Sequence, residues 1–175
     1  ETLDRDLPLV VAVVDLLSGV ESMLLSAGGE HDGGDDTFHD PHSWLDPVIV
    51  QEMVDHLAEA LSDLDPDNTE SYEANAADYS DRVASVHQEF EESVGGANLD
   101  AAVLAGHDSF RYLEHRYDFE LRTPTGVSPN AEVSQRDLQG LIETVDDNGI
   151  DTVLYDPFEA PADEYPQMVE TLFEN

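Results

Sequence analysis

Apolar positions along this chain alternate between short continuous runs and longer stretches at helical spacing. Residues 7–15 (LPLVVAVVD) form a β-branched run, which predicts a strand buried on both faces. Over residues 47–64 the apolar side chains recur every three or four positions, which predicts a helix with Asp46 as N-cap and Pro47 as its first residue. The same spacing over residues 66–94 predicts a second, longer helix.

The second half of the chain repeats a strand-then-helix pattern. Buried strands are predicted at residues 101–106 and 150–155, with a shorter strand at 119–122 between them. The helices that follow are expected over residues 110–117, 134–148 and 159–173. This alternation predicts a parallel sheet with right-handed crossovers, whose ligands lie beyond the carboxyl ends of the strands. His107 and Asp156 directly follow two of these strands, so we expect both at the same rim.

The densest group of candidate metal ligands lies just before the first helix, in TFHDPHSWLDP (residues 37–47). The two Asp-Pro steps favour a short, stiff, non-helical segment that presents His42. A neutral imidazole is the commonest ligand for transition metals, and neighbouring carboxylates add oxygen donors. A capped loop whose histidines merely face water would have the same pattern, so the spacing alone leaves both interpretations open.

The remaining histidines give weaker signals. Residues 27–40 are rich in glycine and acid and have no apolar periodicity, which predicts a mobile surface loop. In that loop His31 and His39 could bind a metal loosely. Three helical histidines lie off the apolar stripes or among charged residues and are interpreted as surface residues: His56, His87 and His115.

Composition narrows the classes of partner and chemistry. The formal net charge is −35, with 41 acidic residues against 6 basic ones, all of them arginine. Such a field disfavours nucleic acids and anionic membrane surfaces, and its even spread is typical of a halophile's solvated surface. Cysteine is absent, which excludes thiolate zinc sites and cysteine nucleophiles and leaves only nitrogen and oxygen ligands. No apolar run approaches the ~20 residues of a membrane span. Because the chain begins at Glu1 without methionine and shows no signal peptide, we expect a fragment or a processed chain.

Taken together, these motifs resemble the zinc/manganese ABC-transporter solute-binding proteins, also called cluster A-I metal-binding lipoproteins or adhesins. The resemblance is carried by DPHSWLDP (40–47), by Asp65-Pro66 with Tyr72 and Asn75, by HDSF (107–110) with Tyr112, and by GVSP (126–129) with Glu132. It covers most of residues 5–170, and the first and third blocks are specific in their order and spacing. The acidic composition suggests a haloarchaeal member.

The resemblance implies an α/β fold of two lobes with parallel sheets, joined by one long rigid helix, with the metal in the cleft between the lobes. On this basis residues 1–64 are the C-terminal part of the N-terminal lobe with its acidic loop. Residues 65–96 are the connecting helix, and residues 97–175 are a C-terminal lobe truncated at its end.

The resemblance also implies that His42 and His107 are metal ligands. Histidine at position 107 resembles the zinc branch of the family, so zinc is expected rather than manganese. Candidate auxiliary ligands are His39, His31 and Asp156. Candidates for orienting the imidazole rings through their other N–H are Asp40, Asp46 and Asp108. The family's first histidine and its carboxylate ligand have no match in this chain.

The function implied is capture of a divalent metal and its delivery to a membrane permease, without catalysis. Such a protein works outside the cytoplasm at the cell surface, as a monomer, and is held to the membrane only through an anchor outside this chain. Two alternatives remain open. One is a metal-dependent hydrolase with an open coordination position, although no HExxH signature is present. The other is an acidic surface or adhesion module with a structural metal.

Overall fold

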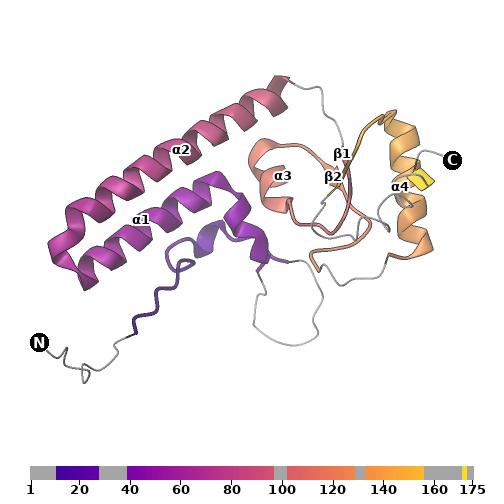
Figure 1. Ribbon diagram of the computed structural model, residues 1–175. Helices are drawn as coiled ribbons and strands as arrows, with labels where there is room; N and C mark the ends of the chain where they lie inside the picture. The colour runs from indigo at the N-terminus through magenta and orange to yellow at the C-terminus, as the bar shows by residue number, and fades with distance from the viewer. Residues whose placement is uncertain (1–10, 28–38, 97–101, 129–132, 156–170, 173–175) are drawn as a thin grey trace, which may run out of the picture.

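The structure is a computed structural model, and it describes residues 11–27, 39–96, 102–128, 133–155 and 171–172. A pair of long helices lies on one side of the molecule and a small parallel sheet lies on the other, with one short helix between them (Figure 1). The long helices are α1 (Pro47–Leu64) and α2 (Thr69–Gly96), and the short helix between the two parts is α3 (Arg111–Tyr117).

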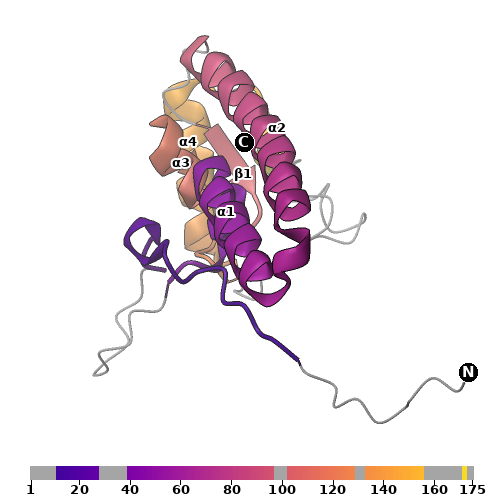
Figure 2. The same cartoon turned by 90° about the vertical axis from the view of Figure 1, so that its left-hand side faces the viewer.

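The helix pair confirms the predicted periodicity. The Asp46 carboxylate caps α1 by accepting hydrogen bonds from the backbone N–H groups of Val48 and Ile49, at 2.8 and 3.4 Å. After Asp65 the chain passes through a 3-10 turn, η3 (Pro66–Asn68), and enters α2. The two helices pack along each other and lie side by side in both views (Figure 1 and Figure 2).

The sheet confirms the predicted parallel topology. Its strands are β1 (Ala102–Ala105), β2 (Leu121–Arg122) and β3 (Val153–Tyr155), in the order β2-β1-β3 with every pairing parallel. Helix α4 (Gln135–Asn148) covers one face, where its Leu141 and Val145 pack against Val103 and Leu172. It starts at a capping box on Ser134 and ends at Gly149. Gly149 has φ 61°, a left-handed conformation that favours glycine.

A second core joins the N-terminal segment, α1 and α3. Its buried residues are Val20, Ile49 and Tyr112, one from each segment. The 3-10 turn η1 (Glu21–Met23) lies beside it. A second 3-10 helix, η2 (Pro41–Leu45), directly precedes α1 and contacts α3. This core therefore fixes the segment that carries His42 against the helix that follows His107.

Two strand predictions need correction. Residues 11–15 of the predicted strand 7–15 form no strand, while residues 7–10 lie outside the described part. Val11 and Val13 are 72% and 90% exposed, because no described strand lies beside them to complete a ladder. In the predicted buried strand 150–155, Leu154 and Tyr155 are 50% and 57% exposed. The reason is that β3 is an edge strand among the described residues and pairs only with β1.

Several other predictions fall wholly or partly outside the described residues. Of the expected helix 159–173, only Thr171 and Leu172 are described, and both are helical. Most of the expected loop 27–40 is likewise outside. In the part of the chain that the structure describes, no helix is long and apolar enough to cross a bilayer.

Candidate metal site

His42 is held by the aspartate that precedes it by two residues. Asp40 is the N-cap of η2 and accepts a hydrogen bond from the His42 backbone N–H at 3.0 Å. The same oxygen, Oδ1, lies 2.7 Å from Nδ1 of the His42 ring. Because an ionised carboxylate can only accept, this contact places the ring proton on Nδ1. Nε2 then carries the ring's acceptor lone pair, which can accept a hydrogen bond or bind a metal.

His107 lies just beyond the carboxyl end of β1, and its ring meets the His42 ring. The backbone after the strand is fixed by hydrogen bonds from Asp108 N to Gly126 O at 3.1 Å and from Ser109 N to His107 O at 2.9 Å. Nε2 of His107 lies 3.0 Å from Nε2 of His42. The ring centroids are 5.0 Å apart, with the planes inclined at 51°. The structure thus brings together the two histidines that the sequence singled out.

This spacing can be compared with what zinc requires. Zinc binds imidazole nitrogens at about 2.0–2.1 Å, so two nitrogens on one tetrahedral ion are about 3.3 Å apart. The observed Nε2–Nε2 distance of 3.0 Å is close to that value. A shift of a few tenths of an ångström would let both nitrogens bind one ion.

Tyr112 ties the His42 segment to α3. Its hydroxyl donates to the Asp40 carbonyl oxygen at 3.0 Å and accepts from Leu25 N at 3.0 Å. Asp40 N in turn donates to Leu25 O at 2.8 Å. Since the Tyr112 side chain is almost fully buried, these bonds are shielded from water and hold the backbone on both sides of the acidic loop.

Asp108, next to His107, has an unusual environment. Burial raises the pKa of its carboxyl from 3.8 to about 6, and the negative charges of Glu114 and Asp40 add to that shift. The Arg111 guanidinium opposes it, with Nε at 3.6 Å from Asp108 Oδ2. Asp108 Oδ1 accepts no hydrogen bond from the described residues.

The third candidate for orienting a ring, Asp46, is used differently. Its carboxylate caps α1 and also accepts three hydrogen bonds from Arg116 of α3. Arg116 Nε lies 3.1 Å from each oxygen, and Nη2 lies 2.7 Å from Oδ2. No hydrogen bond joins Asp46 to either imidazole among the described residues. It acts as a structural clamp between α1 and α3.

The candidate auxiliary ligands do not complete the site within the described residues. His39 is exposed and pairs with Ser26 in an isolated antiparallel bridge. His31 and Asp156 lie outside the described part of the chain. Among the residues that are described, no group of three or more His, Cys, Asp or Glu could hold a metal ion. His42 and His107 therefore stand as a pair.

The helical histidines also differ in their surroundings. His115 is exposed, as predicted. The prediction that His87 is solvated is wrong, because it is half-buried against Tyr117, with Nδ1 2.9 Å from the tyrosine hydroxyl. His56 is also half-buried, and its Nε2 lies 3.0 Å from Ser18 Oγ. Each ring contacts a residue distant in sequence, which periodicity within one helix does not reveal.

The sequence interpretation missed the roles of Arg111, Tyr112 and Arg116. All three lie on α3 and contact the segment around Asp40 and Asp46. One signal was present, since Arg111 is three residues after Asp108, a spacing that suits an ion pair at the start of a helix. The contacts to Asp40 and Asp46, by contrast, depend on how α3 docks against η2 and α1.

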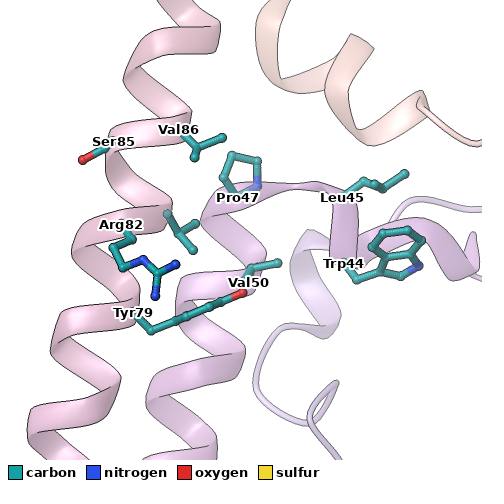
Figure 3. Close-up of a pocket in the computed structure, with 9 residues that line it drawn as sticks. Trp44, Leu45, Pro47, Val50, Tyr79, Arg82, Ser85 and Val86 are labelled. Atoms are coloured by element: carbon teal, nitrogen blue, oxygen red, sulfur yellow. The ribbon is translucent and has the colours of Figure 1, made fainter.

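A separate hollow of about 500 Å³ lies between α2 and the η2–α1 junction (Figure 3). Trp44 and Leu45 of η2 border it on one side, and Tyr79, Arg82 and Val86 of α2 on the other. Neither His42 nor His107 lines it, so the histidine pair is a distinct site.

The fold, with His42 and His107 brought together, can now be compared with known proteins. The family described as "ZnuA: Zinc-uptake complex component A periplasmic" matches residues 2–172. The chain belongs to this family, whose members are transport components. The suggested haloarchaeal origin has no support among the relatives found.

Relatives and solved structures show the same likeness. The zinc-binding lipoprotein AdcA of Streptococcus pneumoniae is 34% identical over 151 residues, which are 82% of this chain and 30% of AdcA. The high-affinity zinc uptake system protein ZnuA of Paracoccus denitrificans is 30% identical over 63% of this chain and 33% of its own length. The crystal structure of AdcAII from S. pneumoniae superposes with a TM-score of 0.75 at 26% identity, over 91% of this chain and 56% of AdcAII. The laminin-binding protein Lbp of Streptococcus pyogenes gives a TM-score of 0.64 at 25% identity, over 77% of this chain and 49% of Lbp.

These alignments also show how much of its relatives' length the chain covers. It spans about a third of the length of these curated relatives and about half of these solved chains. The family and the α/β solute-binding fold therefore apply to the chain, while the activity of the whole protein is a matter for proposal.

Proposed function

We propose that the protein captures zinc as cargo between His42 and His107 and presents it to an ABC-transporter permease, without chemical turnover. The observation that carries this proposal is the 3.0 Å approach of the two Nε2 atoms, with His42 Nδ1 hydrogen-bonded to the buried Asp40. Membership of a zinc-uptake family and likeness to a zinc-binding lipoprotein support zinc over manganese. Two imidazole nitrogens suit zinc better than manganese, which favours oxygen ligands.

In this proposal the two histidines belong to different lobes. The first lobe comprises residues 1–64, the connecting helix residues 65–96, and the second lobe residues 97–175. A tetrahedral ion needs four ligands, so two more must come from water or from groups outside the described residues. Ligands supplied from both sides of a cleft would couple metal loading to a small lobe movement, which a permease can recognise. The site of action is outside the cytoplasm, in keeping with the lipoprotein and periplasmic relatives.

The test is calorimetric zinc titration of the purified protein and of three alanine variants. His42→Ala and His107→Ala should each weaken zinc binding by more than about a hundredfold, since a lost ligand costs more than a lost group that merely orients one. His115→Ala is the matched control, because His115 is exposed and should leave the affinity unchanged. If both site variants fold and bind zinc as tightly as the unmodified protein, His42 and His107 are not the zinc ligands.

A further inference from the structure

Arg111, the first residue of α3, reaches three acceptors that come from three different parts of the chain. Its Nη1 donates to the Ser26 carbonyl oxygen at 2.7 Å and lies 3.6 Å from Asp40 Oδ2. Its Nε lies 3.6 Å from Asp108 Oδ2. The side chain is 30% exposed, so the guanidinium sits at the edge of a largely buried group rather than free in solvent.

Of the two carboxylates that face Arg111, one contacts the His42 ring and the other belongs to the residue next to His107. Asp40 accepts from Nδ1 of His42, and Asp108 follows His107 in the chain. The Asp40 side chain is fully buried, and that of Asp108 is 24% exposed. Like charges in such a poorly solvated place repel each other strongly unless a cation lies between them. Arg111 is placed between them.

The hydrogen bonding of Asp40 shows why this cation matters for His42. Oδ1 of Asp40 serves the His42 backbone and ring, whereas Oδ2 accepts no hydrogen bond from the described residues. The Arg111 guanidinium is within ion-pair distance of that second oxygen. Without it the buried carboxylate would lose the guanidinium that balances its charge, and its orientation toward Nδ1 would lose a support.

We propose that Arg111 is a positioning residue for the histidine pair, one that bridges Asp40 and Asp108 and thereby fixes the tautomer and direction of the His42 ring. This inference rests on the proposed function for its link to zinc, but the tautomer of His42 can be tested without any metal. A lysine should replace Arg111 only in part. Its single ammonium lacks the planar fork that lets Nη1 and Nε face Asp40 and Asp108 at the same time.

The experiment compares Arg111→Gln and Arg111→Lys with Arg122→Gln as control. Arg122 is 53% exposed and pairs with the exposed Glu120, so its loss removes the same charge away from the histidines. In the metal-free protein, long-range ¹H–¹⁵N NMR reports which ring nitrogen of His42 is protonated. We expect predominantly Nδ1–H in the unmodified protein and in Arg122→Gln, and a mixture of tautomers in Arg111→Gln.

Zinc titration provides the second readout. Arg111→Gln should weaken zinc binding by up to about tenfold, the lower end of the cost of losing a group that orients a metal ligand, because Arg111 acts on His42 through Asp40. Arg111→Lys should recover part of that loss, and Arg122→Gln should show none. A wild-type tautomer and wild-type zinc affinity in folded Arg111→Gln would overturn the proposal.

The lysine variant keeps the proposal falsifiable if the glutamine variant fails to fold. Arg111→Lys retains the charge, so it should fold, with less of the Nδ1–H tautomer and a weaker zinc affinity than the unmodified protein. If Arg111→Lys matches the unmodified protein in both readouts, the positioning role is refuted. Failure of the unmodified protein to bind zinc would refute the proposed function instead, while the metal-free tautomer measurement would still decide the role of Arg111.

Discussion

Two Asp-Pro steps at either end of η2 have similar local geometry and different uses. Asp40 and Asp46 are each 2% exposed, each precedes a proline, and each accepts a hydrogen bond from the backbone N–H two residues further on. Each also faces an arginine of α3. They differ in which other groups their carboxylate oxygens contact.

Both oxygens of the Asp46 carboxylate are used in hydrogen bonds that hold the fold together. Arg116 contacts both of its oxygens, and the remaining acceptance goes to the first turn of α1. A charge-assisted pair of this kind, with two oxygens engaged by one planar guanidinium, is strong and directional.

Asp40 Oδ2 lies 3.6 Å from Arg111 Nη1, a longer distance than in the Asp46 pair. Its Oδ1 makes the closest contact, at 2.7 Å, with Nδ1 of His42. The comparison shows how one motif can serve either a fold or a site. The carboxylate whose two oxygens both bond its arginine anchors a helix, and the one that lies 3.6 Å from its arginine orients the His42 imidazole.

Removing Asp46 should have the largest effect on stability. Asp46→Ala takes away the α1 cap and leaves the Arg116 guanidinium, which is 28% exposed, without its partner. We expect the free energy of unfolding to fall by about 3 kcal/mol, combining the loss of a cap with the loss of a mostly buried ion pair. Denaturant unfolding measures it, and the Asp46→Ala/Arg116→Ala double variant tests the pairing. If the two single losses simply add, the clamp does not exist.

Removing Asp40 should affect zinc more than folding. In Asp40→Ala the His42 ring loses the acceptor at Nδ1, while Arg111 keeps its bond to Ser26 and can turn toward solvent. Zinc affinity should fall about tenfold, which is roughly 1.4 kcal/mol of binding free energy, and unfolding free energy should fall less than in Asp46→Ala. Calorimetry and denaturant unfolding of Asp40→Ala and Asp46→Ala measure zinc affinity and stability for both variants. The opposite ranking in either measurement would show that the two steps are not specialised.

Much of this fold could be predicted from local pattern. The cap at Asp46, the helix that starts at Ser134 and the strand–helix alternation of a parallel sheet follow from residue spacing and turn chemistry, because those features depend on neighbours in sequence. The failures at Val13 and Leu154 have a different cause. Both residues sit in apolar runs typical of buried strands, yet burial depends on a neighbouring strand or helix that the run itself does not specify.

Part of the candidate site could likewise be predicted from local signals, and part could not. His42 and His107 could be singled out from the Asp-Pro frame and from the end of a strand, since both are local signals. The Asp40–His42 ring contact spans only two residues and is also a local signal. The clamp from Asp46 to Arg116 could not be predicted, because it depends on how α3 docks against α1. The partners of His87 and His56 were missed for a similar reason, since they come from α3 and from the segment before η1.

A third Asp-Pro step, Asp65-Pro66, sharpens the comparison because no arginine among the described residues pairs with it. Its Oδ2 accepts from Asn68 Nδ2 in the turn at 2.7 Å and from the Tyr72 hydroxyl near the start of α2 at 2.9 Å. The hydrogen bonds from Asn68 and Tyr72 hold the pKa of the Asp65 carboxyl below its usual value of 3.8. A carboxyl whose pKa is lowered by folding stabilises the fold above the usual value, and that contribution is lost as the pH falls through the folded value.

Asp65→Asn should therefore give the smallest change of the three substitutions. The variant should melt slightly below the unmodified protein near neutral pH, because the ionised acceptor is gone while the neutral amide can still accept one of the bonds. This gap in melting temperature should narrow as the pH falls below 3.8, where the native carboxyl also becomes protonated. Thermal unfolding at fixed ionic strength over that pH range measures the gap. A loss as large as that of Asp46→Ala would mean that an Asp-Pro turn stabilises this fold without any arginine, and the contrast drawn between the buried steps would fail.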